Sequence, residues 1–421
     1  MDVHSEPLLI IGAGISGLTL AQACNKEGVP YRIFERDESV TFRSAGWGLT
    51  LNWALQSFRD LLPQDIVSRL PETYVNRKAV DADEKGSFTF FDLSNGQAKW
   101  QVPITSERIR VSRQRLRRLM LTGVDVEWSK TLSNITKDGN GVTAHFTDGS
   151  TASGRLLVAC DGAHSVVRRT IHPDSYENYQ LPVRFIGTGA KFTEEQVSEI
   201  RQLDGYFLQG SDPRSDAYLW FSFLETPGDP GAPDDSHYLC QVMTSWPYRE
   251  GFFGRADPSG VPNTTIGQLS WMKALSADWA EPFHSIVKNI PRDSEIKPVE
   301  LADWIPQRNT EMKFDGRVCL LGDAAHAMVM YRGEGANHAI VDVEVLLERI
   351  RPLMEQESVS DEASRGAIES YEKEVVKRTE VAVLASRQAC LDAHDFKRLN
   401  DKSPLLRRRM MRADLEEVQQ S

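Results

Sequence analysis

Three short motifs in this chain combine glycine with an acidic residue, a pairing suited to a phosphate or sugar ligand. The first is Gly12-Ala-Gly14-Ile-Ser-Gly17, which is followed at a distance by Glu35. Gly12 permits a tight turn, Gly14 lets the backbone approach a pyrophosphate, and Gly17 lets a helix pack against a strand. Glu35 follows at about the 20-residue interval at which an acid binds a ribose hydroxyl. This motif predicts a site for the adenosine end of a dinucleotide.

The second and third motifs each follow an apolar run that is typical of a buried strand. Asp161-Gly162 follows 155–160 and precedes Arg168, and Gly322-Asp323 follows 318–321. Cofactors bind at the carboxyl ends of such strands. The two motifs therefore predict polar groups at the same edge of a sheet.

Beyond the third motif, the sequence predicts a loop that approaches a ligand closely and then a helix. Gly333 and Gly335 allow the close approach, and 337–350 has the apolar spacing of a helix. The N-terminus of this helix would offer free N–H groups to an electron-rich ligand edge.

The elements that position these motifs indicate an α/β fold. Apolar strand-like runs at 8–11, 31–34, 155–160 and 318–321 alternate with helical patterns. The runs 124–128, 132–136 and 142–146 predict a small antiparallel sheet. Strand patterns dominate 181–297, residues 361–398 are helical in pattern, and 405–412 predicts an exposed amphipathic helix.

Length, charge and composition exclude several classes of protein. A chain of 421 residues exceeds one ordinary core, so two domains are expected. The net charge of −11 argues against nucleic acid as a general partner, and no apolar run reaches the ~18 residues of a membrane span. The polar start Met1–Pro7 leaves no room for a signal peptide, which predicts a cytoplasmic protein. Five cysteines, odd in number and far apart, predict free thiols and no metal site.

The three motifs, in this order and spacing, resemble the para-hydroxybenzoate hydroxylase-like family of FAD-dependent monooxygenases, known as group A. The resemblance implies a Rossmann-like FAD-binding domain interleaved with a β-sheet substrate domain, plus C-terminal helices. It places the FAD-binding domain at 1–75, 106–178 and 301–350, the substrate domain at 76–105 and 179–300, and the C-terminal helical segment at 351–421.

The resemblance also implies a chemistry and a set of contact residues. Noncovalent FAD would be reduced by NADPH or NADH and would insert one oxygen atom from O2 into an aromatic or polycyclic secondary-metabolite-like substrate, by hydroxylation or epoxidation. The implied cofactor contacts are Gly12, Gly14, Gly17, Glu35, Arg36, Gly48, Arg113, Asp161, Gly162, Arg168, Gly322, Asp323, Gly333, Gly335, Ala336 and Asn337. Met330 stands where the family usually has a proline beside the flavin ring, whereas Tyr331-Arg-Gly-Glu-Gly335 keeps the family pattern.

Tyr218, Trp220 and Tyr238 are candidates for the substrate pocket, with the core of a sheet as the alternative position for each. The sequence indicates no catalytic acid or base and no oligomeric state. Two alternative functions on the same fold are a flavin-dependent reductase and a halogenase, and a third is a flavin-binding protein without turnover. The halogenase signature Trp-x-Trp-x-Ile-Pro is absent, because Asp303-Trp-Ile-Pro306 lacks its first tryptophan.

Overall fold

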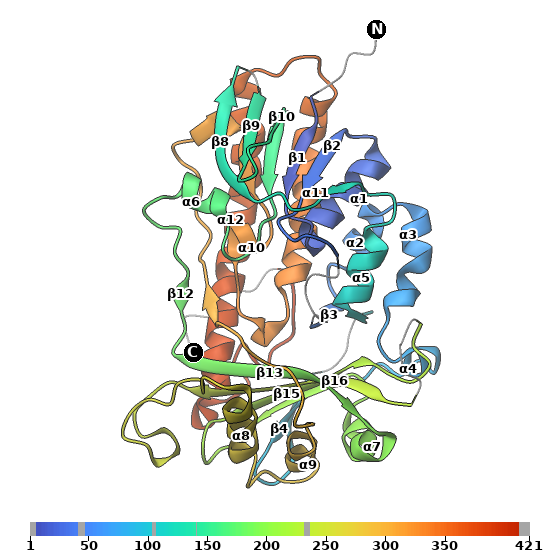
Figure 1. Ribbon diagram of the computed structural model, residues 1–421, viewed down its shortest axis with the longest axis vertical. Helices are drawn as coiled ribbons and strands as arrows, with labels where there is room; N and C mark the ends of the chain where they lie inside the picture. Colours follow the sequence, from blue (N-terminus) through green and yellow to red (C-terminus); the bar gives the residue numbers. More distant parts are fainter. Residues whose placement is uncertain (1–5, 41–46, 103–106, 140, 231–235, 412–421) are drawn as a thin grey trace.

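The computed structural model describes residues 6–40, 47–102, 107–139, 141–230 and 236–411. Within these ranges the chain builds one lobe around a parallel sheet and another around a larger mixed sheet (Figure 1). The predicted domain boundary at 105/106 and the end of the C-terminal segment, 412–421, lie outside the described residues.

The first lobe contains the strands that carry the three motifs. Its five-stranded parallel sheet has the order β19 (Val318–Leu320), β11 (Leu156–Ala159), β1 (Leu8–Ile11), β2 (Tyr31–Phe34) and β7 (Val126–Glu127). The apolar side chains of β1, β11 and β19 are buried, as expected for strands covered on both faces. The motifs that end β1, β11 and β19 therefore emerge side by side.

A three-stranded antiparallel sheet flanks the first, in the order β10 (Thr151–Gly154), β9 (Gly141–Phe146) and β8 (Leu132–Asp138). The prediction that 124–128 belongs to this sheet is wrong, because Val126 and Glu127 pair in parallel with Ile33 and Phe34 of β2. β10, which follows the Asp148-Gly149 turn, supplies the third strand instead.

The second lobe is a seven-stranded sheet. Its order is β17 (Ile296–Pro298), β13 (Val183–Phe192), β16 (Tyr238–Pro247), β15 (Tyr218–Glu225), β14 (Phe207–Ser211), β4 (Phe88–Asp92) and β5 (Ala98–Val102). Two short pairs complete the strands: β3 (Gly48–Leu51) with β6 (Ile109–Ser112), and β12 (Tyr179–Gln180) with β18 (Ala302–Asp303).

Helices cover both sheets. Around the parallel sheet lie α1 (Ile15–Glu27), α2 (Leu55–Leu61), α3 (Gln64–Arg69), α5 (Arg113–Met120), α6 (Val166–Ile171), α10 (Asp323–His326) and α11 (Gly335–Met354). α4 (Arg77–Asp81) leads toward the second lobe, whose outer face is covered by α7 (Glu194–Leu203), α8 (Thr265–Leu275) and α9 (Phe283–Lys288) (Figure 1). The inner face of the seven-stranded sheet is left to face the first lobe.

The long helix α12 (Asp361–Ala393) reaches both lobes. Near its start the Tyr371 hydroxyl donates to the Leu320 carbonyl of β19 at 2.9 Å, and at its end the Ala393 carbonyl accepts from Ser211 of β14 at 2.7 Å. The prediction of an exposed amphipathic helix at 405–412 is wrong for the described part. Residues 405–411 are not helical, and Leu405 and Leu406 are buried against the inner face of the sheet.

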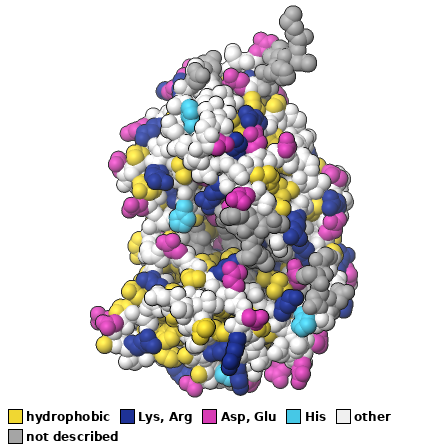
Figure 2. Space-filling model, viewed as in Figure 1, with side chains coloured by type: hydrophobic (Ala, Val, Ile, Leu, Met, Phe, Trp, Pro, Cys, Tyr) yellow, Lys and Arg dark blue, Asp and Glu magenta, His cyan; other side chains and the backbone are white. Residues whose placement is uncertain are grey.

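On the face viewed in Figure 2, lysine and arginine side chains are interspersed with aspartate and glutamate. No helix in the described ranges is long and apolar enough to cross a bilayer.

Candidate active site

A cavity of about 590 Å³ lies between the two lobes. One wall comes from the starts of α1, α5 and α11, from β3, and from the loop 328–334. The other wall comes from the inner face of the seven-stranded sheet, including Tyr218, Trp220 and Met243. Its size and mixture of apolar and polar walls are typical of a small-molecule site.

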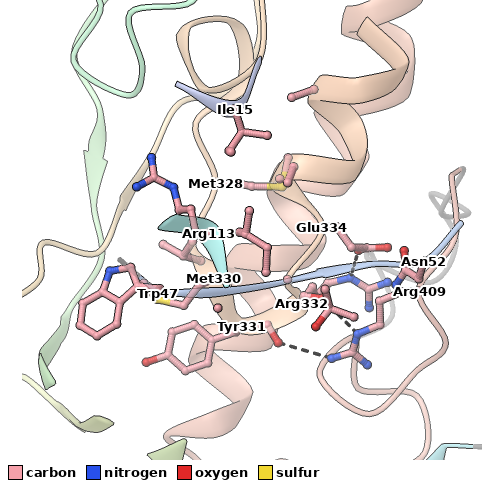
Figure 3. A pocket seen from close by; sticks show the side chains of 18 of the residues that line it. Ile15, Trp47, Asn52, Arg113, Met328, Met330, Tyr331, Arg332, Glu334 and Arg409 are labelled. Atoms are coloured by element: carbon pink, nitrogen blue, oxygen red, sulfur yellow. Dashed lines mark hydrogen bonds and ion pairs between the residues drawn. The ribbon is translucent and has the colours of Figure 1, made fainter. Parts of the chain in front are cut away.

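Figure 3 shows how a set of side chains around the cavity is arranged. Ile15 and Met328 lie at one end, Arg113 and Trp47 on one side, and Arg409 with Arg332 and Glu334 on the other. Of the predicted cofactor residues, those that line the cavity are Gly14, Gly48, Arg113, Gly162, Asp323, Gly333, Gly335 and Ala336. The cavity therefore brings together residues from all three motifs.

The first motif divides between packing and cavity lining. A Cβ on Gly17 would lie 2.0 Å from the Gly12 carbonyl oxygen, and a Cβ on Gly12 would lie 2.4 Å from the Cys160 carbonyl oxygen. These two glycines therefore let β1 and α1 pack against β11. Gly14 caps α1 and lines the cavity, and no atom outside its chain neighbours would lie within 4 Å of a Cβ there. Gly14 thus leaves room for a ligand at the start of α1.

Glu35 lies behind the cavity wall. Its carboxylate accepts hydrogen bonds from the backbone N–H of Ala13 at 2.8 Å and of Asp37 at 3.1 Å. Arg117, a residue not predicted for the site, lies 3.8 Å from the same carboxylate and donates to the Ala13 carbonyl at 2.9 Å. Glu35 and Arg117 together fix the loop of the first motif, whereas Arg36 is exposed outside the cavity.

The residues of the second motif mainly contact neighbouring parts of the protein. Asp161 caps α6 by accepting a hydrogen bond from the Val166 N–H at 2.8 Å, and burial raises its pKa. Arg168 is buried and donates to the Ala324 carbonyl of α10 at 3.3 Å and to the Ala163 carbonyl. Arg168 therefore joins the second motif to the third behind the wall, and only Gly162 of this group lines the cavity.

The third motif lies on a buried ionic network. The Gly322 N–H donates to Asp342 at 2.9 Å, and the same carboxylate contacts His326 at 2.6 Å and Arg378 of α12 at 2.5 Å. Burial alone would raise the pKa of Asp342, but His326 and Arg378 outweigh that effect and hold it well below its usual range. Arg378 lies 55 positions beyond Asp323. No local sequence pattern around it indicates that it pairs with Asp342.

Asp323 is the acid of this motif that reaches the ligand space. Its side chain lines the cavity, and its exposed surface faces that space. Burial raises the pKa of Asp323, and interactions with His326 and Arg113 partly oppose that rise. Asp323 is therefore placed to accept hydrogen bonds from a ligand.

Asn337, at the start of α11, holds the neighbouring strand. Its side-chain oxygen accepts from the Asn52 N–H at 3.0 Å, and its nitrogen donates to the Thr50 carbonyl at 3.1 Å. Asn337 does not line the cavity but fixes β3 beside Gly333, Gly335 and Ala336, which do.

Two of the three predicted substrate residues line the cavity. Tyr218 and Trp220 are two positions apart on β15 and so face the same side of the sheet. Tyr238 does not line the cavity. On β16 it lies an odd number of positions from the cavity-lining Gln241 and Met243, so its side chain points to the opposite face of the sheet. Its hydroxyl contacts Arg201 at 2.6 Å on the outer face.

Comparisons with known proteins agree with this geometry. The family described as "FAD binding domain" matches residues 6–215 and 272–386. A probable FAD-dependent monooxygenase of Arthroderma benhamiae is 44% identical over 412 residues, covering 96% of this chain and 95% of its own. The chain belongs to the FAD-dependent monooxygenases.

Further similarities support the same family and fold. The FAD-dependent monooxygenase tazP of Aspergillus terreus is 36% identical, over 83% of this chain and 91% of its own. A crystal structure of Klebsiella pneumoniae HpxO complexed with FAD and uric acid superimposes with a TM-score of 0.70 at 22% identity, covering 94% of this chain and 91% of that one.

The residues of this monooxygenase fit FAD. The N-termini of α1 and α11 both open on the cavity, at Gly14 to Ser16 and at Gly335 to Ala336, where unpaired N–H groups and the helix dipole attract electron-rich groups. Glycine at both places permits close approach.

Several cavity residues of the monooxygenase have no counterpart among the predicted ones. They are mainly arginines and aromatics: Trp47, Phe88, Arg108, Arg110, Phe207 and Arg409. The arginine-rich segment at 110–120 was a signal that could have drawn attention to Arg110. Arg409 is 86 positions beyond Asp323 and reaches the cavity only through the fold.

Proposed function

We propose that this monooxygenase uses NADPH or NADH to reduce noncovalently bound FAD and inserts one atom of O2 into an aromatic or polycyclic organic substrate. Hydroxylation and epoxidation are both compatible with this proposal. A secondary metabolite is the expected type of substrate. Bound FAD supplies the redox chemistry and the activation of oxygen.

The observation that carries the proposal is the continuity of the cavity from the start of α1 to the inner face of the seven-stranded sheet. Cofactor-side groups such as Gly14 and Asp323 share one space with Trp220 and Phe207, whose rings stack with centroids 5.1 Å apart. A flat substrate held against these aromatic walls would share one cavity with the flavin. Holding both in one cavity favours productive orientation.

The cofactor contacts follow from the same geometry. We assign direct FAD contact to the predicted residues that line the cavity, and support of its wall to Gly12, Gly17, Glu35, Asp161, Arg168, Gly322 and Asn337. The assignment of 1–75, 106–178 and 301–350 to the FAD-binding domain and of 76–105 and 179–300 to the substrate domain belongs to this proposal.

Turnover under oxygen-18 gas tests the reaction. A compound that stimulates NADPH or NADH oxidation should give a product with one labelled oxygen atom. A reductase would give unlabelled product without needing oxygen, and a halogenase would require halide. Labelled product would support the proposal, and unlabelled product from a substrate that turns over would refute it.

A further inference from the structure

The last described residues of the chain run back to the cavity. We call residues 403–411 the C-terminal strap and residues 328–334 the cavity loop. Leu405 and Leu406 of the strap are buried in the apolar cluster on the inner face of the seven-stranded sheet, and Arg409 lines the cavity. The strap therefore forms part of the cavity wall, next to the cavity loop.

Arg409 of the strap donates hydrogen bonds to the cavity loop. Its Nε lies 3.2 Å from the Arg332 carbonyl oxygen, and its Nη2 lies 3.4 Å from the Tyr331 carbonyl oxygen (Figure 3). These carbonyls belong to the short 3₁₀ helix η4 (Met330–Arg332), which ends at the left-handed Gly333. The last carbonyls of a helix have no partner within it, so Arg409 supplies their donors from a distant part of the chain.

Arg332 of the cavity loop reaches in the opposite direction. Its Nη2 donates to the Arg408 carbonyl at 3.3 Å, and its Nη1 donates to the Pro404 carbonyl. The side chain of Arg332 is buried, so these bonds replace those that it would make with water. Each segment therefore contributes an arginine that binds the backbone of the other.

Glu334 joins a third segment to this contact. One oxygen of its buried carboxylate accepts from the Met410 N–H at 3.0 Å and from the indole N–H of Trp53 at 3.2 Å, and the other accepts from Arg332 at 2.6 Å. Moving any of these donors would leave a buried charge less well paired, which is costly. We call Arg332, Glu334 and Arg409 the clasp.

The clasp holds backbone that faces the proposed cofactor space. Arg332 and Glu334 flank Gly333, and Glu334 directly precedes Gly335, where α11 begins. Both glycines line the cavity. Displacing either anchored side chain would move the glycines, because consecutive Cα atoms are held about 3.8 Å apart. The clasp therefore sets the position of the N–H groups at the start of α11.

The clasp also lies beside the wall that comes from the second lobe. The ring centroids of Tyr331 and Tyr218 are 5.2 Å apart, and Arg409 lies over the Phe88 ring of β4, 3.8 Å from its centroid. Glu35, at the predicted adenosine end, lies instead behind the start of α1. Since the ring that reacts must face the substrate, the cavity loop is expected at the flavin end of FAD.

We propose that the C-terminal strap is part of the cofactor site and that Arg409 is a positioning residue, which sets the cavity loop against the flavin end of FAD by holding the Tyr331 and Arg332 carbonyls. This inference rests on the proposed contact of Gly333 and Gly335 with FAD. The first motif, which is predicted to bind the adenosine end, has no part in the clasp. Arg409 should therefore affect binding of the flavin end and not of the adenosine end.

Tryptic cleavage of the unaltered full chain tests the proposal without any variant. If the strap and FAD stabilise the same position of the cavity loop, FAD must in turn stabilise the attachment of the strap. Trypsin cuts after arginine, so mass spectrometry of the intact chain can follow cleavage after Arg407 and Arg408. Saturating FAD should slow this cleavage at least about tenfold, whereas saturating ADP, the adenosine end alone, should slow it less than about twofold.

Variants test the role of Arg409 itself. Calorimetric titration of the FAD-free full chain measures the affinities for FAD and for ADP separately. Arg409→Met should weaken FAD binding at least about tenfold, the scale of one charged hydrogen bond, and should leave ADP binding unchanged. Arg409→Lys should restore part of the FAD affinity, since a single ammonium cannot reproduce the forked donors of the guanidinium.

Arg398→Met is the matched control, because it removes another arginine side chain from the C-terminal part of the chain. The Arg398 side chain is 80% exposed, pairs with Asp395 at 3.2 Å and lies outside the cavity lining. Both affinities should equal those of the wild type in this variant.

Four outcomes would overturn the proposal. They are an unchanged FAD affinity in Arg409→Met, an equal loss of FAD and ADP affinity in that variant, equal tryptic cleavage with and without FAD, and equal protection by ADP and FAD. The second would show that Arg409 supports only the fold. If Arg409→Met does not fold, cleavage of the unaltered chain decides. No measurement uses turnover, so a missing oxygen-18 label counts against the proposed reaction and not against the strap.

Discussion

Asp342 of α11 and His326 of α10 are both fully buried, and the carboxylate lies 2.6 Å from the imidazole Nε2. The same carboxylate accepts the Gly322 N–H, so the turn that presents Asp323 to the cavity depends on it. This contact links the stability of the first lobe to the shape of the cofactor wall.

Asp342→Asn should destabilise the protein by about 3–5 kcal/mol, because it leaves Arg378 as a buried charge without its partner. Urea unfolding of the FAD-free protein measures the loss, and titration with FAD should show weaker binding. Glu355→Gln, at the exposed far end of α11, should change neither quantity. A wild-type unfolding midpoint for Asp342→Asn would contradict the role of the network.

Gly14 and Gly17 should respond oppositely to alanine. Gly17→Ala places a Cβ 2.0 Å from a backbone oxygen and should cost about 1–3 kcal/mol or more of stability. In Gly14→Ala the new Cβ meets no such atom, so the free energy of unfolding of the FAD-free protein should change by less than about 1 kcal/mol. The affinity for FAD should nevertheless fall. Equal FAD affinity in Gly14→Ala and wild type would place the cofactor elsewhere.

Trp220 and Tyr238 distinguish the two faces of the seven-stranded sheet. Trp220→Ala removes a cavity wall and should raise the Michaelis constant for the aromatic substrate at least several-fold, because large aromatic surfaces dominate such contacts. Tyr238→Phe loses only the contact of its hydroxyl with Arg201 and Glu194 on the outer face and should leave that constant unchanged. Steady-state oxidation of NADPH or NADH, the proposed reductants, measures both constants, and the reverse pattern would be inconsistent with this cavity.

Glu372 of α12 should make stability depend on pH. Its carboxylate accepts the Asn309 N–H at 3.0 Å, and burial raises its pKa to about 7. A raised pKa in the folded state means that the stabilising contribution is complete below the unfolded pKa of about 4.5 and is lost as pH rises to about 7.

Glu372→Gln removes this titration and keeps an acceptor for Asn309. Its stability relative to wild type should rise between pH 4.5 and 7 by about 3 kcal/mol and stay level above pH 7. Urea unfolding across this range measures the difference, with the exposed Glu380→Gln as control. A difference that does not vary with pH would show that Glu372 is not the group responsible.

The sequence predicted the parts of the site that depend on local patterns. The apolar runs at 8–11 and 31–34 form β1 and β2 with the same bounds. The turn glycines and strand-end acids stand in a fixed order and spacing along the chain, although Gly12 packs against Cys160 and Glu35 accepts from the Ala13 N–H. Their positions could therefore be inferred without knowledge of tertiary packing.

The contacts that sequence could not predict join distant parts of the chain. Val126 pairs with β2 because the parallel sheet has room for a fifth strand there, which the pattern of 124–128 does not encode. Leu405 and Leu406 are buried because the inner face of the seven-stranded sheet covers them. Arg110 and Arg409 meet in one cavity only after residues about 300 positions apart have been folded together.

The attachment of α12 to both sheets bears on how such enzymes can diverge. Tyr371 holds it to β19 and Ser211 holds it to β14, while the segment after it brings Arg409 into the cavity. A chimera that exchanged only the seven-stranded sheet between two relatives would separate that sheet from the helix and the arginine fitted to it. Substrate preference in this lineage is therefore expected to be inherited with the C-terminal residues as a single unit, although the chain order places them far apart.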